Sequence, residues 1–202
     1  MAGAKQFLTF SQQVEYLKSE KEIAVSDDQF AEEILQRIGY FALMGGYKEL
    51  FRIPFTKKYK TGTSFNEIVA LYQFDAELRE LFLKYLLQIE RHIGNLIAHY
   101  FVEAHGISQA EYMNPNNYNN SPRNRKIITG LLRKLHGAVT TTDYAHVNYY
   151  RAKYGNIPLW ITTNVLTFGS LSKMYNVLEQ SLRSKICRHF PNVNQRQLER
   201  FL

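Results

Sequence analysis

The stretch from Ser64 to Phe101 constrains the fold of this chain more than any other. Apolar residues recur in it at steps of three and four, and Gly94 is its only helix-breaking residue. This spacing predicts a helix with one continuous apolar stripe, which a folded domain buries in its core. Ser64 is the expected N-cap, with Glu67 as its capping-box partner. The stripe consists of Leu78, Leu81, Phe82, Tyr85, Ile89, Ile93, Leu96 and Tyr100, and we expect Leu86 to be buried with it.

Two features of this predicted helix stay open. Asp75 could cap a second start, so a short helix and a long one could meet at a bend beside it. The second face of the helix is polar, with Arg91, Asn95 and His99 in register. These three side chains are either a candidate catalytic group or a buried polar network that joins the helix to its neighbours.

The rest of the chain also predicts helices. Period-two alternation of apolar residues is nearly absent, and 202 residues is the size of one domain. We therefore expect an all-α fold, a single-domain helical bundle over residues 1–202 around the long central helix. The other expected helices cover residues 8–20, 27–40, 123–136, 140–155, 158–168, 171–190 and 194–202. Ser26 is the expected N-cap of the helix at 27–40, and Ile127, Leu131, Leu132 and Leu135 are expected to face inward from the helix at 123–136.

Positive charge is concentrated in the second half of the chain. Residues 1–90 hold 11 Lys and Arg against 13 Asp and Glu, a net charge of −2, whereas residues 91–202 hold 14 against 5, a net charge of +9. This asymmetry favours a polyanion such as RNA as the partner of the second half, although a solvated basic surface would look the same. The candidate RNA-binding residues are Arg123, Arg125, Lys126, Arg133, Lys134, His146 and Arg151.

A second basic segment is the predicted loop at residues 52–63. It carries Lys57, Lys58 and Lys60 around Tyr59, a pattern that suits a phosphate backbone with a stacked base. The commoner interpretation of such a run is a charged loop that faces water.

The sequence contains few signs of metal or cofactor chemistry. It has no phosphate-binding glycine loop, no zinc-protease motif and no nucleophile elbow, and its single cysteine, Cys187, cannot anchor a zinc finger. We therefore expect no cofactor and no metal. His92 and His99 lie two helical turns apart, and structural histidines are the favoured interpretation of both. The lack of a secretory signal and of a long apolar run predicts a cytoplasmic protein.

Several longer motifs resemble the Abi family of bacterial abortive-infection, phage-resistance proteins, of the AbiD/AbiF type. The similar segments are RIGYFALMGGYKELF at Arg37–Phe51, GTSFNEIVALYQFDAELREL at Gly62–Leu81 and QIERHIGNLIAHYF at Gln88–Phe101. His146 and IPLWITTNVLTFGSLSKMY at Ile157–Tyr175 follow in the same order. The resemblance therefore extends over nearly the whole chain.

This resemblance implies a HEPN-like helical fold and a role in phage defence or in a toxin–antitoxin pair. HEPN proteins are often dimeric, and many are metal-independent ribonucleases, so RNA is the expected substrate or partner. The resemblance also allows a homodimer and an antitoxin of RNA or protein. The chemistry it implies is general acid–base cleavage by a histidine, with an arginine that holds the phosphate. The alternative is a non-catalytic protein that binds RNA or regulates a partner.

The catalytic segment of this family is not recognisable in the chain. Similar proteins are expected to carry an Arg-Asn…Ala-His segment beyond the region that matches 195–202, and the sequence ends at Leu202. The HEPN ribonuclease motif that the resemblance implies is an arginine, four to six residues, and then a histidine. The only internal match to this spacing is Arg183…His189, whose side chains would not share one face of an unbroken helix. Residues 1–202 alone are therefore expected to have little or no ribonuclease activity.

Overall fold

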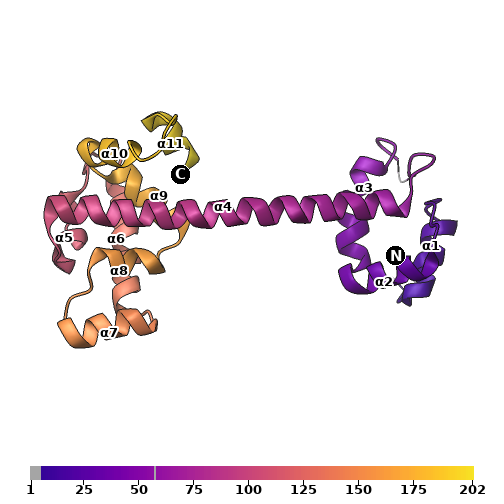
Figure 1. Cartoon of the computed structure of the whole chain (residues 1–202), viewed down its shortest axis with the longest axis horizontal. Coiled ribbons are helices and arrows are strands. Elements are labelled where there is room, and N and C mark those ends of the chain that lie inside the picture. The colour runs from indigo at the N-terminus through magenta and orange to yellow at the C-terminus, as the bar shows by residue number, and fades with distance from the viewer. Residues whose placement is uncertain (1–5, 57) are drawn as a thin grey trace. The chain divides into compact units, whose positions relative to one another are not determined.

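The computed structural model describes residues 6–56 and 58–202, which form helices joined by turns and loops (Figure 1). No β-strand occurs among them, and their β-type contacts are two isolated bridges, Ala24–Ser64 and Arg52–Tyr59. The predicted all-α fold is confirmed. The chain divides into two compact units, Met1–Leu83 (unit 1) and Lys84–Leu202 (unit 2). The single domain over residues 1–202 stays a prediction.

Unit 1 is built from short helices with side-chain caps. Thr9 caps the first helix in a capping box with Gln12, and Asp27, rather than Ser26, caps the second by accepting a hydrogen bond from the Phe30 N–H. The elements are α1 (Phe10–Ser19), α2 (Asp28–Ile38), the π-helical turn η1 (Phe41–Gly45), α3 (Gly46–Phe51) and the first part of α4 (Phe65–His105). Their buried core includes Val14, Leu17, Ile34, Leu35, Leu43, Phe65, Ile68 and Val69.

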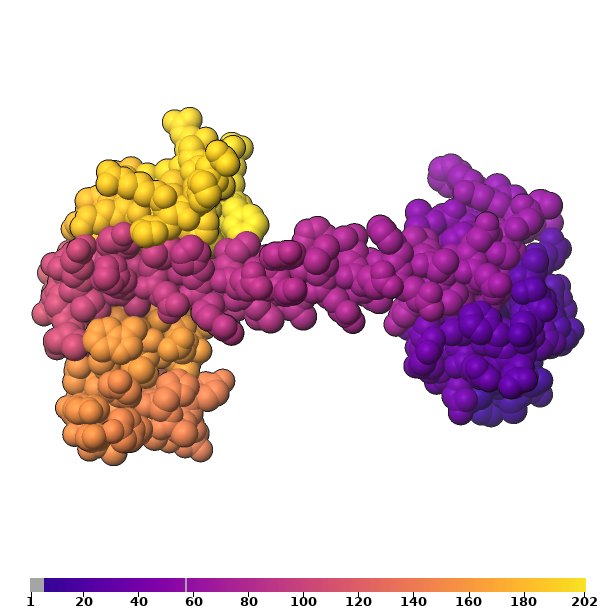
Figure 2. Space-filling view, in the orientation of Figure 1, coloured from indigo at the N-terminus to yellow at the C-terminus, as the bar shows by residue number. Residues whose placement is uncertain are grey.

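Unit 2 surrounds the last part of α4 with shorter helices, and α10 and α11 cover one side of it (Figures 1 and 2). The helices are α5 (Gln109–Met113), α6 (Arg125–Thr140), α7 (Ala145–Tyr154), α8 (Leu159–Thr162), α9 (Phe168–Val177), α10 (Gln180–Cys187) and α11 (Gln195–Phe201). Two 3₁₀ turns, η2 (Pro115–Asn117) and η3 (Thr163–Val165), complete it.

Two predicted helices of unit 2 have different boundaries. The helix predicted at 171–190 is wrong, because Leu178 and Glu179 take up extended backbone between α9 and α10. The Leu178 side chain is fully buried there, so packing prevails over helix propensity. The helix predicted at 140–155 begins only at Ala145, because α6 continues to Thr140.

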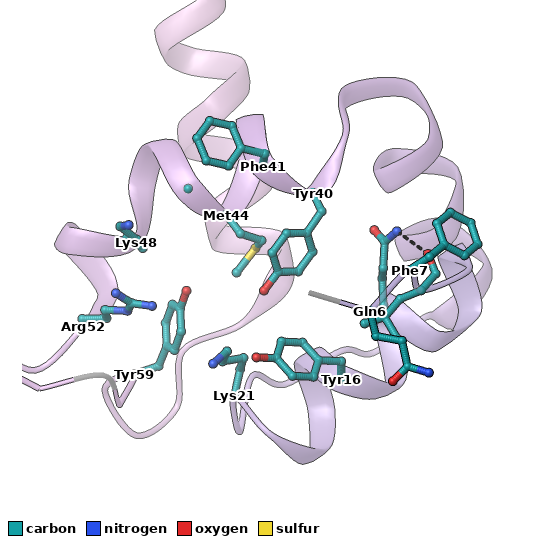
Figure 3. A pocket seen from close by; sticks show the side chains of 13 residues that line it. Gln6, Phe7, Tyr16, Lys21, Tyr40, Phe41, Met44, Lys48, Arg52 and Tyr59 are labelled. Atoms are coloured by element: carbon teal, nitrogen blue, oxygen red, sulfur yellow. Dashed lines mark hydrogen bonds between the residues drawn. The ribbon is translucent and has the colours of Figure 1, made fainter. Parts of the chain in front are cut away.

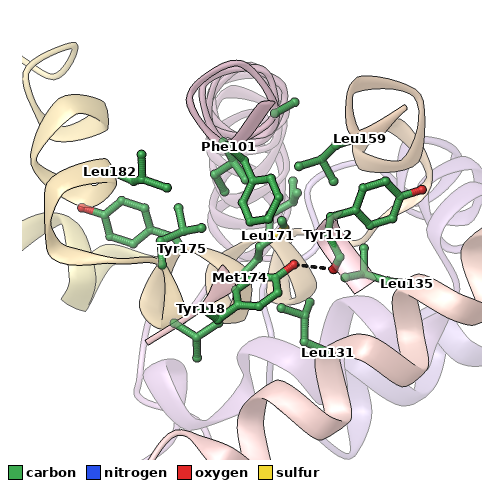
Figure 4. Close-up of a cluster of buried hydrophobic side chains, with 14 of the residues drawn as sticks. Phe101, Tyr112, Tyr118, Leu131, Leu135, Leu159, Leu171, Met174, Tyr175 and Leu182 are labelled. Atoms are coloured by element: carbon green, nitrogen blue, oxygen red, sulfur yellow. Dashed lines mark hydrogen bonds between the residues drawn. The ribbon is translucent and has the colours of Figure 1, made fainter. Parts of the chain in front are cut away.

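The core of unit 2 contains tyrosines whose hydroxyl groups are satisfied internally (Figure 4). Tyr118 donates a hydrogen bond to the carbonyl of Tyr112 at 2.7 Å, and Tyr112 donates to the carbonyl of Ile157 at 2.6 Å. Burial raises the pKa of Tyr112 to about 12, so its hydroxyl stays protonated at neutral pH. These bonds connect the segment around α5 to the start of α8.

Helix α4 is one uninterrupted helix of 41 residues, about 60 Å long at 1.5 Å per residue. The predicted capping box is confirmed, because the Glu67 N–H donates to Ser64 Oγ and the Ser64 N–H donates to the Glu67 carboxylate. The alternative of a bend beside Asp75 is wrong, because the helix continues through this residue. Asp75 instead accepts hydrogen bonds from Tyr47 and Arg79, so it has a structural role within the helix.

The apolar stripe of α4 is buried only in part. The core of unit 1 takes in α4 as far as Tyr72, and the core of unit 2 takes it in from Ile89. Between them, Leu86 is 42% exposed and Phe82 is 60% exposed, so the prediction that Leu86 lies in the core is wrong.

The homodimer stays a prediction. Among the described residues, no helix combines the length and the apolar character needed to cross a membrane.

Candidate functional site

Histidine side chains from α4 and from the end of α10 gather on one face of unit 2. His189 Nε2 and the Tyr100 hydroxyl are hydrogen-bonded at 2.7 Å. The centroid of the His92 ring lies 6.5 Å from that of His189 and 5.1 Å from that of Phe190. His92 and His189 are exposed, so solvent and a ligand can reach both. We call His92, Tyr100 and His189 the histidine cluster.

The backbone positions these groups by simple helix geometry. His92 and Tyr100 are eight residues apart on α4, which places them about 80° apart around the helix axis. His189 follows α10 in a tight turn, in which its N–H donates to the carbonyl of Ile186. The buried side chain of Ile186 holds this turn against the core of unit 2.

A cation and a carboxylate border the histidine cluster. Lys185 Nζ lies 5.5 Å from the centre of the Tyr100 ring and 2.7 Å from the Glu103 carboxylate. The hydrogen bond and the charge of Lys185 lower the pKa of Glu103. Because both side chains are about half exposed, this ion pair adds little stability, but it holds a positive charge beside the cluster.

This arrangement is suited to proton transfer. Imidazole is the side chain that exchanges protons near neutral pH, and two such rings lie close together beside a hydroxyl and an ammonium group. Among residues 6–56 and 58–202, no group of three or more His, Cys, Asp or Glu side chains could hold a metal ion. Acid–base chemistry is the chemistry that the two imidazole rings can supply.

The predicted group Arg91, Asn95 and His99 shares one exposed face of α4. The alternative of a buried polar network is wrong, because all three residues are exposed to solvent. The His99 ring lies 5.0 Å from the Tyr100 ring, so this residue borders the histidine cluster. His92 and His99 are both exposed, and each ring packs against an aromatic ring, so the interpretation of both as structural histidines stays a prediction.

The structure separates the side chains of the other predicted pair. Arg183 donates to the Glu199 carboxylate and to Gln180 Oε1, each at 2.7 Å, and so joins α10 to α11. His189 instead contacts Tyr100 of α4. The two residues therefore do not form one site.

The predicted basic helix presents its cations to solvent. Arg123, Arg125, Lys126 and Arg133 are exposed, and the described residues place no carboxylate within ion-pair distance of them. Lys134 donates to Ser170 Oγ at 3.3 Å. The opposite face of α6 packs into the core through Ile128, Leu131, Leu135, Ala138 and Val139. The prediction that Ile127 points inward is wrong, because Ile127 is exposed and Ile128 is buried.

The two remaining predicted RNA-binding residues have different surroundings. Arg151 donates to the carbonyls of Val139 and Thr142 and to Asn148 Oδ1, so its guanidinium group joins α7 to the end of α6. It is mainly a structural residue. His146 is exposed and stacks on Tyr144 with 5.7 Å between the ring centroids. In unit 1, Lys58 and Lys60 are exposed, Tyr59 is buried, and Lys57 lies outside the described residues.

Sequence reasoning missed Tyr100 and Lys185 as members of this site. Tyr100 and His189 are 89 residues apart, so no local spacing relates them. His92 and Tyr100 lie about 12 Å and about 80° apart on α4, so their spacing gives no signal of a shared site either.

A family model described as Abi-like protein matches residues 33–202 of the chain. Neither the curated proteins nor the solved structures contain a significant match.

Proposed function

Since the chain belongs to the Abi-like protein family, and so has a role in abortive infection, the bacterial defence against phage, we propose that it performs this role by binding RNA through unit 2. The observation that carries the proposal is the group of exposed cations on α6 and just before it, within ion-pair distance of which the described residues place no carboxylate. Unit 2 holds 15 Lys and Arg against 6 Asp and Glu, a net charge of +9.

The position of these cations favours a ligand over a stabilising role. Arg125 and Lys126 occupy the first turn of α6, and that turn contains no acidic residue. The helix dipole is positive at this end, so cations here destabilise an isolated helix, whereas a bound phosphate would be attracted by both the dipole and the side chains. Arg123 lies directly before the helix and extends this positive surface.

Charge reversal on α6 tests the proposal. The variant Arg123→Glu, Arg125→Glu, Lys126→Glu should weaken binding of single-stranded RNA and lower the slope of log affinity against log salt by about 2, at about 0.7 per phosphate contact. The matched control Arg37→Glu, Lys58→Glu, Lys84→Glu changes the net charge equally on exposed positions outside α6. Equal losses in the two variants would show that only overall charge matters and would refute a binding face on α6.

The histidine cluster favours a second candidate function, slow metal-independent cleavage of the bound RNA, as the HEPN resemblance implies. One imidazole would accept the proton of a 2′-hydroxyl, whose oxygen attacks the adjacent phosphorus. The other would donate a proton to the departing 5′-oxygen, leaving a cyclic phosphate and a free 5′-hydroxyl. Lys185 would lie near the charged phosphate oxygens. We expect a low rate of cleavage, because Arg183 is bound to the Glu199 carboxylate and is not available to hold the phosphate.

Incubation of the purified chain with total RNA, with and without EDTA, tests this candidate. Cleavage that resists EDTA should fall about 100-fold in His189→Ala and in His92→Ala, since each removes one acid–base group. His136→Ala is the control, because this exposed histidine lies on α6 and outside the cluster. Cleavage unchanged in both cluster variants would exclude the histidine cluster as its source. RNA binding is tested separately, by a gel-shift assay of the charge-reversal variant of α6. A toxin–antitoxin role would follow if this cleavage arrests the growth of the host.

A further inference from the structure

A cavity of about 780 Å³ opens in unit 1, on elements that the proposed function does not use (Figure 3). Its walls come from the segment before α1, from α1, from the π-helical turn η1, from α3 and from the loop that carries Tyr59. The volume is within the usual range for small-molecule sites, about 300–1,000 Å³. π-helical turns are rare and occur frequently at functional sites.

Aromatic rings form much of the cavity wall. Tyr16, Tyr40 and Tyr59 direct their hydroxyl groups toward the same space, and Phe7 and Phe41 lie at its border (Figure 3). The centroids of Tyr16 and Tyr40 are 6.4 Å apart. Burial, with smaller contributions from Tyr16 and Tyr59, raises the pKa of Tyr40 to about 12, so its hydroxyl is protonated at neutral pH. The wall can therefore stack a planar ring and also offer hydrogen bonds.

Three cations line the same cavity, and its lining includes no carboxylate among the described residues. They are Lys21, Lys48 and Arg52, and they gather in a unit whose own net charge is −2. Lys21 Nζ lies 4.9 Å from the centre of the Tyr16 ring, and Arg52 Cζ lies 5.4 Å from that of Tyr59. The charges therefore border the rings, as an anionic ligand with an aromatic part requires.

Two buried polar atoms of the cavity residues have no hydrogen-bond partner among the described residues. Arg52 Nε is one, and the nearest carboxylate, that of Glu49, is 3.9 Å from Arg52 Nη1, beyond hydrogen-bond distance. Gln13 Oε1 is the other. Gln13 Nε2 already donates to the carbonyl of Leu8, which fixes the amide and leaves Oε1 as an acceptor. Buried polar atoms are normally paired, so this donor and this acceptor are available to hydrogen-bond a ligand.

We propose that this cavity binds a nucleoside phosphate, with its base against the tyrosines and its phosphates on Lys21, Lys48 and Arg52. Gln13 Oε1 would accept a hydrogen bond from an exocyclic amine of the base, which adenine, guanine and cytosine have and uracil lacks. The same chemistry is found in a free nucleotide and in the phosphorylated end of an RNA strand. The site lies in unit 1 and α6 lies in unit 2, so this ligand would be additional to the RNA proposed for α6.

Calorimetric titration of the full chain tests the proposal with ATP, GTP, CTP, UTP, tripolyphosphate and adenosine as separate probes. We expect ATP, GTP or CTP to bind at least tenfold more tightly than UTP, tripolyphosphate or adenosine. A 5′-phosphorylated RNA tetranucleotide that binds more tightly than the nucleotides would identify an RNA end as the source of the ligand, and weaker binding would identify a free nucleotide. Tripolyphosphate that binds as tightly as every nucleotide would overturn the proposal.

Variants locate the site. Lys48→Gln and Arg52→Gln should each weaken nucleotide binding about tenfold, whereas Arg37→Gln, an exposed cation outside the cavity, should not change it. Lys48 is partly exposed and keeps the test valid if Arg52→Gln unfolds. The α6 charge-reversal variant should retain nucleotide binding, so failure of this proposal and failure of RNA binding are distinguishable. Equal weakening in Arg37→Gln and Lys48→Gln would overturn the proposed site.

Discussion

Replacement of Tyr112 by phenylalanine should destabilise unit 2 by about 2 kcal/mol. The Tyr112 hydroxyl is buried, donates to the carbonyl of Ile157 at 2.6 Å and lies 3.0 Å from Thr162 Oγ1. Its removal leaves the buried Ile157 carbonyl without a donor, which costs about 1–3 kcal/mol. Thr162 keeps its bond to the carbonyl of Pro158, so its share of the loss is smaller.

Thermal unfolding followed by circular dichroism measures this effect. A loss of about 2 kcal/mol corresponds to a fall of roughly 8 °C in the melting temperature of a unit of this size. Tyr149→Phe is the matched control, because Tyr149 is half exposed and its hydroxyl only accepts a bond from Lys153, so a change below about 0.5 kcal/mol is expected. If Tyr112→Phe melts within 2 °C of the parent chain, the reasoning about a satisfied buried hydroxyl is refuted.

Two further predictions concern stability. Leu86→Asp should leave the circular dichroism spectrum unchanged, because Leu86 is 42% exposed. Ile97→Asp should unfold unit 2, because Ile97 is fully buried and an unpaired charge there costs several kcal/mol. Loss of helix in both variants would show that Leu86 is buried after all. Glu103 has a lowered pKa, so its pair with Lys185 stabilises the fold above the ordinary carboxyl value of 4.5 and stops doing so as the pH falls through the lowered pKa. Urea midpoints between pH 2 and pH 7 should therefore depend less on pH in Glu103→Gln, and identical pH profiles would contradict the role of the pair.

Helix content and the Ser64 cap could be predicted from the sequence because they depend on neighbouring residues. The Ser64 capping box needs only residues three apart, and the apolar spacing of α6 needs only its own turn-by-turn pattern. The break at Leu178 depends instead on burial of that side chain among distant residues. Local propensity carries no information about such packing.

The candidate site could be predicted only in part, for the same reason. The cations of α6 lie on one segment, and charge and periodicity identified most of them. The contact between Tyr100 and His189, like the gathering of Lys21, Lys48 and Tyr59 around one cavity, depends on how separate helices pack. Periodicity also predicted that Leu86 is buried, because a stripe indicates which face is apolar and not what covers it.

Photocrosslinking of 4-thiouridine-labelled RNA to the full chain, followed by mass spectrometry of the crosslinked peptides, tests the central claim that unit 2 binds RNA through α6. The account predicts crosslinks on residues 123–134, lost in the variant Arg123→Glu, Arg125→Glu, Lys126→Glu and retained in the variant Arg37→Glu, Lys58→Glu, Lys84→Glu. Crosslinks confined to unit 1, or crosslinks on α6 that persist after its charges are reversed, would contradict the account.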